Sequence, residues 1–363
     1  MKKLLFEIAL LLWSPTLLQA QAPEHIADQV GQHWLELHND FRSESDVWGN
    51  YTLDLTLEAL LHLDRHTASR AYTEPVLEVF RKRNIGPGDT ISYTTQPFCS
   101  INFTLGEIEK DKAWHSGFIA ESYRMYESAQ YAPEGGVLIN HKGDYRLLVD
   151  YLQEYASRLA KTGYLTNDTA LFSACVDQFL IYETILRHDS TGLWRQGRGW
   201  CSDTTLLSQG AWSRGHGWLL RGLVTSMLYL PEAYREKLLP VLERVSYALL
   251  NVQRESGMYP ILLNRAPDQS APDVSGTGMI AYYMAIASQK GWLDAAVFEP
   301  SIQKATRALR AYISDNGEIL SSSKGPGPLC HEDEYINYVP EVDEKHGFQG
   351  AIYGMIAEML LNE

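Results

Sequence analysis

Trp212-Ser213-Arg214-Gly215-His216-Gly217-Trp218 is the stretch on which the fold and the candidate site depend. It runs directly into apolar residues at helical spacing, from Leu219 to Leu228, before Pro231 ends the pattern. We therefore expect a glycine-hinged loop that opens a buried helix. Glycines let the backbone approach a ligand, while Trp and Arg offer flat apolar faces and a forked cation, which together suit a sugar acid.

A second cluster of similar composition lies just upstream, Trp194-Arg195-Gln196-Gly197-Arg198-Gly199-Trp200. An isolated tryptophan at the start of a helix is usually a core residue. The alternative interpretation is therefore that these tryptophans belong to the core and bind no ligand. Two clusters of Trp, Arg and Gly within one short region favour a ligand-binding site instead.

The composition indicates a folded enzyme-sized chain. It has 363 residues, of which 45% are hydrophobic and 21% charged, enough to bury the core of one large domain or two ordinary ones. The formal net charge of −14 argues against nucleic acid as a partner.

The N-terminus is typical of a secretory signal peptide. Two lysines precede an apolar run from Leu4 to Leu18 that ends at Ala20, although Glu7 interrupts the run and leaves an uncleaved anchor as the alternative. No later stretch reads as a membrane span. We expect a signal peptide at 1–20, a single domain at 21–363, and a secreted protein without membrane contact after cleavage.

Sequons and cysteines agree with export. Four cysteines can form two disulfides in an oxidising compartment, with three pairings that the sequence does not separate, and they lack metal-site spacing. The sequons predict glycosylation at Asn50, Asn102 and Asn167, and the cysteines are Cys99, Cys175, Cys201 and Cys330.

Helical patterns and short loops alternate about ten to twelve times along the chain, and strand signals are scarce. Asp144 is expected to cap a helix that ends near Gly163, with a further helix over 168–187. Other helices are expected near 24–41, 53–61, 74–83, 112–128, 214–229, 238–249, 273–288, 298–313 and 346–361. The simplest architecture is an all-α toroid of helical hairpins, with the site at the loop-rich end.

An ordered series of motifs resembles the unsaturated glucuronyl and rhamnogalacturonyl hydrolases, glycoside hydrolase families 88 and 105. The resemblance covers nearly all of the mature chain and implies a six-hairpin (α/α)6 barrel. The motifs are Glu134-Gly135-Gly136, Asp150, Thr191-Gly192-Leu193-Trp194, Trp212 to Trp218, Ser275-Gly276-Thr277, Tyr335 to Val339 and His346-Gly347.

The resemblance also implies a reaction. Members of these families hydrate the C4=C5 double bond of the unsaturated uronic acid that polysaccharide lyases leave at a non-reducing end. An aspartate supplies the proton and assists the attack of water, and the hemiketal then opens to release the sugar. The aspartate lies in a helix after the Glu-Gly-Gly turn and about forty residues before the Thr-Gly-Leu turn, which selects Asp150. Its pKa should be raised by partial burial.

Substrate contacts follow from the same comparison. Arg214 and Trp218 match the Arg and Trp that contact substrate in the family, and the arginine fork suits a uronate carboxylate. Further candidate contacts are Trp194 and Trp212 as ring platforms, His216, and Gln196, which stands where the family has a histidine. We expect an acidic oligosaccharide as substrate, a monomer, no metal and no cofactor.

The chain departs from the family pattern in ways that keep other functions open. Cys99 stands where a second aspartate often precedes an Ile-Asn pair, and Leu148 replaces an aromatic residue. One alternative is a carbohydrate-binding pseudoenzyme on the same scaffold. Another is a hydrolase of saturated glycans, in which Glu134 or Asp273 pairs with Asp150 across about 5 to 10 Å.

Overall fold

A computed structural model describes residues 21–38, 51–82, 84–90, 100–141 and 143–363. The predicted signal peptide at 1–20, the sequon at Asn50 and the cysteine at position 99 lie outside these described residues.

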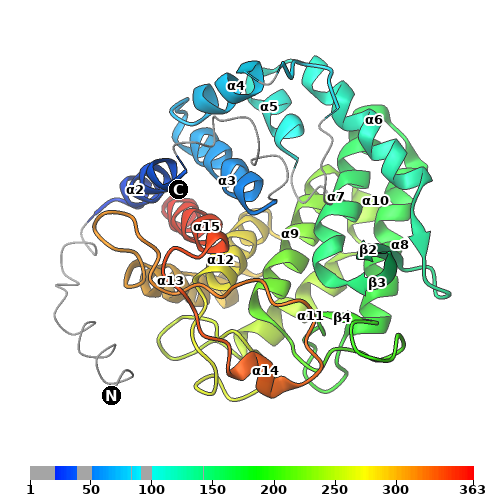
Figure 1. Ribbon diagram of the computed structural model, residues 1–363, viewed down its shortest axis with the longest axis vertical. Coiled ribbons are helices and arrows are strands. Elements are labelled where there is room, and N and C mark those ends of the chain that lie inside the picture. Colours follow the sequence, from blue (N-terminus) through cyan, green and yellow to red (C-terminus); the bar gives the residue numbers. More distant parts are fainter. Residues whose placement is uncertain (1–20, 39–50, 83, 91–99, 142) are drawn as a thin grey trace.

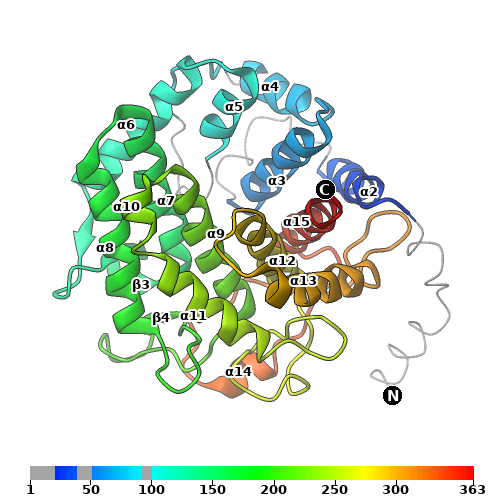
Figure 2. The same cartoon turned by 180° about the vertical axis from the view of Figure 1, so that it is seen from behind.

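The helices form two concentric rings around a common axis, and each inner helix is joined to an outer one (Figures 1 and 2). The predicted all-α toroid of helical hairpins, an (α/α)6 barrel, is thereby confirmed. The inner helices are α3 (Tyr51–Thr67), α5 (Ile101–Glu109), α7 (Val149–Thr166), α9 (Ser213–Tyr229), α12 (Val274–Gln289) and α15 (Lys345–Asn362). The outer helices are α2 (Pro23–Leu37), α4 (Thr73–Lys82), α6 (Ala113–Glu127), α8 (Thr169–Leu186), α11 (Leu239–Leu250) and α13 (Ala295–Arg310), and α10 (Glu232–Arg235) and α14 (Glu332–Ile336) are short.

Burial explains why the inner helices lack a polar stripe. In α9 every residue from Ser213 to Val224 is buried, and in α12 every residue from Val274 to Ala285. A helix enclosed on all sides needs no solvent-facing side. The outer helix α13 is amphipathic instead, with Phe298, Ile302 and Leu309 among its buried residues.

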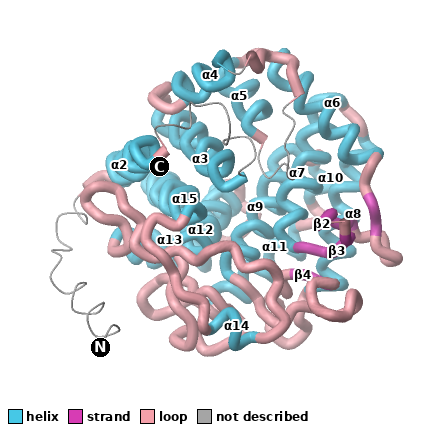
Figure 3. The backbone as a smooth tube through the Cα atoms, in the orientation of Figure 1, coloured by secondary structure: helices cyan, strands magenta, loops and turns pink. Residues whose placement is uncertain are grey.

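A small antiparallel sheet was not expected from the sequence. Its strands are β1 (Gln130–Tyr131), β2 (Val137–His141), β3 (Asp144–Leu148) and β4 (Gly197–Arg198), in that spatial order (Figure 3). The prediction that Asp144 caps a helix is wrong, because 144–148 pairs with β2 on one side and with distant β4 on the other. Helix α7 therefore starts at Val149, and Asp150 lies in its first turn.

The end of α7 also differs from the prediction. The helix continues past Gly163 to Thr166, and the residue that follows, Asn167, adopts the left-handed conformation with φ 58°. Asp168 then caps α8 by accepting a hydrogen bond from the backbone N–H of Ala170. Gly163 is needed for packing instead, because a Cβ there would approach the Phe172 ring to 2.7 Å.

Of the two sequons within the described residues, one is compatible with a glycan on the folded protein. Asn167 is exposed at the end of α7. Asn102 lies in α5 with 5% exposure, and its Oδ1 accepts a hydrogen bond from the Phe103 backbone N–H at 3.1 Å. Burial of Asn102 argues against a glycan there in the folded state, and glycosylation at either position stays a prediction.

Two cysteines form a disulfide that joins distant loops. Cys201 follows β4 and Cys330 precedes α14, and they are bonded across 129 residues of sequence. Cys175 is a buried free thiol on α8, and burial raises its pKa to about 12. The bonded pair occurs in one of the three pairings that the sequence left open, but that pairing also needs a second disulfide at Cys175, which is free.

Helix α8 departs from the expectation that no later stretch could span a membrane. Among the described residues it has the length and composition for a span, with a mean hydropathy of 1.2 over 18 residues. Half of this helix is buried inside the barrel. A helix that packs into the core of a folded protein can have the same length and composition. Packing of α8 against α7 therefore explains its apolar character.

Close backbone contact between α12 and α15 gives a stability prediction. A Cβ on Gly278 would overlap the backbone of Gly350, which cannot move aside as a side chain can. We expect Gly278→Ala to lower the free energy of unfolding by about 2 to 4 kcal/mol. Urea unfolding followed by circular dichroism measures this difference.

Gly86→Ala is the matched control, because a Cβ at Gly86 meets nothing nearer than 3.7 Å. It should change the free energy of unfolding by less than about 0.5 kcal/mol. Equal stability of the two variants would contradict the close packing of α12 on α15.

Candidate active site

The N-terminal ends of five inner helices meet at one face of the barrel. Arg214 of α9 donates to Ser275 of α12, Gly215 of α9 lies against Asp150 of α7, and Tyr51 of α3 contacts His346 of α15. Helix N-termini carry partial positive charge and unpaired N–H groups, so their convergence creates a region that favours anions.

Asp150 is placed at the centre of this face by the start of α7. Asp150 as a whole is partly exposed to solvent, but its carboxyl oxygen Oδ1 is buried and has no hydrogen-bond partner among the described residues. A Cβ at Gly215 would lie 3.7 Å from this oxygen, so no larger residue separates the carboxyl group from α9. Burial raises the pKa of Asp150 to about 7, although the nearby Arg214 opposes the shift. A carboxyl group of this pKa can both donate and accept a proton near neutral pH.

Arg214 is buried, and its guanidinium is held through one nitrogen and unpaired along one edge. Its Nη1 donates to Ser275 Oγ at 2.9 Å and to the Ser323 carbonyl oxygen at 2.6 Å, and it lies 3.9 Å from Glu344 Oε2. Its Nε and Nη2 are buried without a partner among the described residues. Buried polar groups are almost always hydrogen-bonded, and this Nε/Nη2 edge has the spacing that a carboxylate accepts in bidentate fashion.

Trp212 supports the arginine. The Arg214 guanidinium lies over the Trp212 ring at 4.3 Å, so one face of the indole is already occupied. The indole Nε1 is buried and has no partner in the described part of the chain. The Arg214 guanidinium therefore occupies one face of the Trp212 ring, and that face is not available as the predicted platform for a sugar ring.

The other two candidate indoles lie deeper. Trp194 is 1% exposed and Trp218 is 3% exposed, with Arg221 over the Trp218 ring at 5.6 Å. A stacking platform for a sugar presents a face to solvent when the site is empty. Burial of this extent favours a packing role for Trp194 and Trp218, which is the alternative that the sequence left open for each of them.

His216 joins the two Trp clusters. Its Nδ1 lies 2.8 Å from the Trp212 carbonyl oxygen, and its Nε2 accepts the backbone N–H of Trp194 at 2.9 Å. Burial lowers its pKa to about 4, so the ring is neutral, with the proton on Nδ1. Both ring nitrogens are occupied by backbone, which leaves neither for the predicted contact with substrate.

Gln196 positions a loop. Its Nε2 donates to the Pro326 carbonyl oxygen at 2.9 Å, and its Oε1 accepts the Tyr335 hydroxyl at 2.6 Å. The Tyr335 hydroxyl in turn accepts the backbone N–H of Leu329 at 2.8 Å. Gln196 is 2% exposed, so it holds the segment before α14 in place, and its predicted contact with substrate is replaced by contacts within the protein.

Sequence reasoning missed a chain of polar groups that reaches Arg214. The Tyr51 hydroxyl lies 3.0 Å from His346 Nε2, and His346 Nδ1 lies 2.9 Å from Glu344 Oε1. A Cβ at Gly325 would lie 3.5 Å from both the Tyr51 hydroxyl and Arg214 Nη2, so these two groups share one site. Burial raises the pKa of Tyr51, with Arg214 opposing the shift and Asp150 adding to it. The motif at 346–347 pointed to His346, but no local signal identified Tyr51 or Glu344.

The carboxylates that would serve a two-carboxylate mechanism are occupied elsewhere. Glu134 forms a bidentate ion pair with Arg198 at 2.8 and 2.9 Å, and this contact lowers the pKa of Glu134 to about 2. Asp273 is fully buried and caps α12, accepting from Ser275 Oγ and from the backbone N–H groups of Gly276 and Ser323. Neither geometry favours pairing with Asp150 across a substrate.

No group of three or more His, Cys, Asp or Glu with metal-holding geometry occurs among the described residues. The acidic run at 331–334 opens α14, where Glu334 Oε2 accepts the backbone N–H groups of Cys330 and His331. Glu334 therefore caps the helix, and Glu332 pairs with Arg265 and Asn264.

Comparison with known proteins agrees with this geometry. The family model described as Glycosyl Hydrolase Family 88 matches residues 25–362. A solved glycoside hydrolase of family 105 from C. acetobutylicum ATCC 824 is similar with a TM-score of 0.78 and 18% identity, over 93% of this chain and 100% of that one. A possible family 105 member from Salmonella enterica serovar Paratyphi A has a TM-score of 0.76 and 22% identity, over 97% and 95%.

A third solved structure carries a named activity. The unsaturated glucuronyl hydrolase from Bacillus sp. GL1, described as responsible for the degradation of glycosaminoglycan, is similar with a TM-score of 0.62 and 15% identity, over 88% of each chain. No curated protein matches the sequence.

Proposed function

The chain belongs to Glycosyl Hydrolase Family 88, and from this membership we propose that it removes an unsaturated uronic acid from the end of an oligosaccharide by hydrating the C4=C5 double bond. The observation that carries the proposal is geometric: Asp150 Oδ1 is buried against Gly215 without a partner among the described residues, and the adjacent Arg214 has an unpaired guanidinium edge. Burial also raises the pKa of Asp150 to about 7. The similar protein from Bacillus sp. GL1 is itself named an unsaturated glucuronyl hydrolase.

The proposed reaction uses one carboxyl group twice. Protonated Asp150 gives its proton to C4 of the unsaturated ring, and positive charge develops at C5, stabilised by the ring oxygen. The resulting carboxylate then accepts a proton from the water that bonds to C5. The product is a hemiketal at C5, which opens to a ketone and releases the remaining sugar. This chemistry differs from hydrolysis at the anomeric carbon, which needs two carboxyl groups.

Arg214 holds the substrate for this reaction. Its Nε/Nη2 edge receives the uronate carboxylate, and its stacking on Trp212 and anchoring by Ser275 fix the orientation of the fork. Because the guanidinium is already held in place, little side-chain entropy is lost when the carboxylate binds.

Loss of ultraviolet absorbance tests the proposed function. Hydration removes the conjugated double bond of an unsaturated uronyl disaccharide, so absorbance should fall with time in proportion to enzyme concentration. Binding of the disaccharide without any fall in absorbance would identify a carbohydrate-binding pseudoenzyme. Release of sugar while the absorbance persists would identify cleavage at the anomeric carbon, and either result would overturn the proposal.

The pH dependence follows from the raised pKa of Asp150. The proton donor is present below a pH of about 7 and is lost as the pH rises through that value. We expect kcat/KM on the unsaturated disaccharide to fall about tenfold for each pH unit above that point. Initial rates measured from about pH 5 to about pH 9, which spans both sides of the raised pKa of Asp150, give this pH profile. A flat profile across neutral pH would contradict Asp150 as the donor.

We also propose that the protein is exported. The charged and apolar N-terminal stretch is that of a signal peptide, and the disulfide between Cys201 and Cys330 is of the kind that persists in oxidising compartments. The exposed Asn167 sequon is a glycan acceptor under this proposal. N-terminal sequencing of protein recovered from the medium tests it, with a start near Gln21 expected and an intact Met1 contradicting cleavage.

A further inference from the structure

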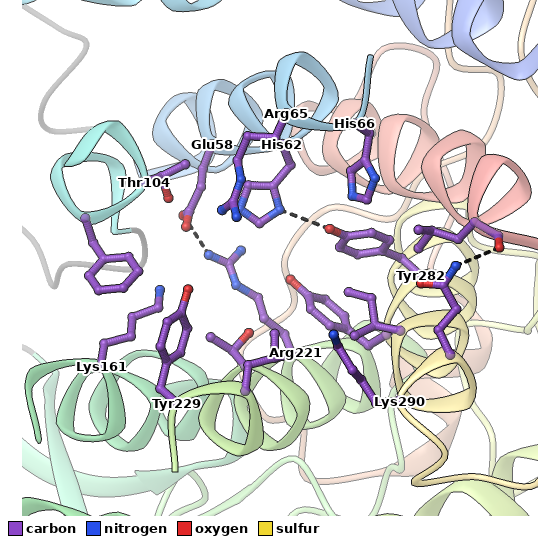
Figure 4. Close-up of a pocket in the computed structure, with 17 residues that line it drawn as sticks. Glu58, His62, Arg65, His66, Thr104, Lys161, Arg221, Tyr229, Tyr282 and Lys290 are labelled. Carbon is purple, nitrogen blue, oxygen red and sulfur yellow. Dashed lines mark hydrogen bonds and ion pairs between the residues drawn. The ribbon is translucent and has the colours of Figure 1, made fainter. Parts of the chain in front are cut away.

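A cavity of about 330 Å³ (Figure 4) lies at the opposite end of the inner helices from Asp150. Its lining comes mainly from the later turns of α3, α7, α9 and α12, for example His62, Lys161, Arg221 and Tyr282. The volume is at the lower end of the range of about 300 to 1,000 Å³ that is typical of small-molecule sites. No step of the proposed reaction uses this cavity.

Positive charge is in excess around the cavity. The side chains that line it include four formal cations, Arg65, Lys161, Arg221 and Lys290, and one carboxylate, Glu58. Burial alone would raise the pKa of Glu58, but Arg221 and Lys161 outweigh it and lower that pKa to about 2. The carboxylate is therefore ionised, and the side chains that line the cavity carry a formal charge of +3, four cations less one carboxylate. A further carboxylate that acts on Lys161, that of Glu154, is held in an ion pair with Arg158.

The two deepest cations have donors available. Arg221 is 5% exposed, and its Nη2 donates to Glu58 Oε2 at 2.7 Å, whereas its Nη1 is buried without a partner among the described residues. Lys161 is 6% exposed, and its Nζ lies 4.8 Å from the centre of the Phe103 ring. In the described part of the chain we find no hydrogen bond or ion pair for this ammonium group, which points into the cavity in Figure 4.

Compensation of helix dipoles does not account for these two side chains. Cations near the last turn of a helix are stabilised by its partial negative charge, and Arg65 at the end of α3 is such a case. The effect is confined to the last turn, whereas Lys161 lies five residues before the end of α7 and Arg221 eight residues before the end of α9.

Burial is costly for the Lys161 ammonium group and for Arg221 Nη1, which lacks the partner that Arg221 Nη2 has in Glu58. Desolvation lowers the pKa of Lys161 to about 8, with Glu58 opposing the shift and Arg221 adding to it. A bound anion would restore the lost interactions of Lys161 and of Arg221 Nη1 together.

We propose that this cavity binds a small oxyanion, no larger than a monosaccharide, whose carboxylate, sulfate or phosphate group is held by Lys161 and Arg221. The hydroxyl groups of Thr104, Tyr229 and Tyr283 line the same space and can bind the hydroxyls of a sugar acid. Two sources share this chemistry, a free inorganic oxyanion and a sugar that carries an acidic group.

Isothermal titration of the full protein with sodium sulfate, glucuronate and glucose tests the proposal. We expect saturable binding of sulfate and glucuronate, and none of glucose up to tens of millimolar. Tighter binding of glucuronate than of sulfate assigns the site to a sugar acid, and equal binding assigns it to a free oxyanion. Binding of glucose as tight as that of the anions, or no saturable binding of either anion, would overturn the proposal.

Variants locate the binding event. Lys161→Met should weaken sulfate binding about tenfold or more, because a charged donor is lost while a side chain of similar length remains. Lys161→Arg should restore it. Lys237→Met removes an exposed lysine from the end of α10 and should have no effect. If Lys161→Met fails to fold, Lys161→Gln replaces it in the same comparison.

Arg214→Lys separates this site from the candidate active site. If sulfate binding is lost in Arg214→Lys but unchanged in Lys161→Met, the anion binds beside Asp150 and the distal site is refuted. If Lys161→Met weakens binding and Arg214→Lys does not, the distal site is supported, whatever the outcome of the absorbance assay.

Discussion

Asp150→Asn is expected to lower kcat/KM on an unsaturated uronyl disaccharide by about a thousandfold or more. General acid and base catalysis contributes about a hundredfold to ten-thousandfold, and Asp150 is proposed to act in both roles. The amide has nearly the same shape and keeps its place in the first turn of α7, so binding of the disaccharide should stay within a few-fold of the wild type. Rates and equilibrium binding measured on one preparation separate the two effects.

The same variant should be more stable at neutral pH. The pKa of Asp150 is about 7 in the folded protein against a usual value of 3.8, so folding disfavours the ionised form. This cost is absent below the usual pKa, develops as the pH rises, and is complete above about 7, where it reaches at most about 4 kcal/mol. Asparagine cannot ionise, so the stability of Asp150→Asn relative to wild type should increase from pH 4 to pH 8.

Asp144→Asn is the matched control. Asp144 lies on β3 with an exposed side chain that pairs with Arg146 at the surface, and its substitution should leave turnover within about twofold. Near-normal turnover in Asp150→Asn, or an equal loss in Asp144→Asn, would remove Asp150 from its proposed role.

Arg214→Lys is expected to lower kcat/KM for the carboxylated substrate by about a hundredfold. Lysine keeps the positive charge but lacks the Nε/Nη2 edge, which is unpaired in the structure. The substitution therefore removes the two charge-assisted hydrogen bonds proposed for the substrate carboxylate. The substitution should reduce the preference for the carboxylate form of the substrate. Activity on the methyl ester of the same disaccharide, which lacks the carboxylate, should be little altered. The ratio of the two kcat/KM values is the measurement.

Arg198→Lys controls for the loss of an arginine near the site. Arg198 pairs with Glu134 on a partly exposed surface and has no part in the proposed clamp, so its ratio should match the wild type. An unchanged ratio in Arg214→Lys would show that the carboxylate is recognised by another group.

The ring of helices was predictable because its physical basis is local. Apolar residues recur at helical spacing through nearly every inner helix, and strong breakers such as Pro231 and Gly192 separate the runs. The strand at 144–148 has one partner, β2, directly before it in the chain, and a second, β4, about fifty residues away, which supplies hydrogen bonds that no local pattern reveals. The position of Asp150 within α7 shifted for this reason.

The site was predictable in its residue types and less so in their roles. The clusters of Trp, Arg, Gly and His were recognised from the sequence. Arg214 has an unpaired guanidinium edge, as expected for a residue that binds a carboxylate. Partners that are distant in sequence decide whether a side chain contacts the protein or a ligand. In His216, for example, both ring nitrogens contact the backbone, of Trp194 and of Trp212. Tyr51 and His346 are 295 residues apart and meet because α3 and α15 are adjacent in the ring.

The reaction in deuterium oxide tests the central claim most directly, because only hydration of the double bond forms a new carbon–hydrogen bond. If Asp150, equilibrated with the solvent, protonates C4, the uronic acid that is released carries one deuterium on C4 at the earliest times measurable by mass spectrometry, and Asp150→Asn yields no such product. Release of a uronic acid that still contains its double bond and no carbon-bound deuterium would contradict the account.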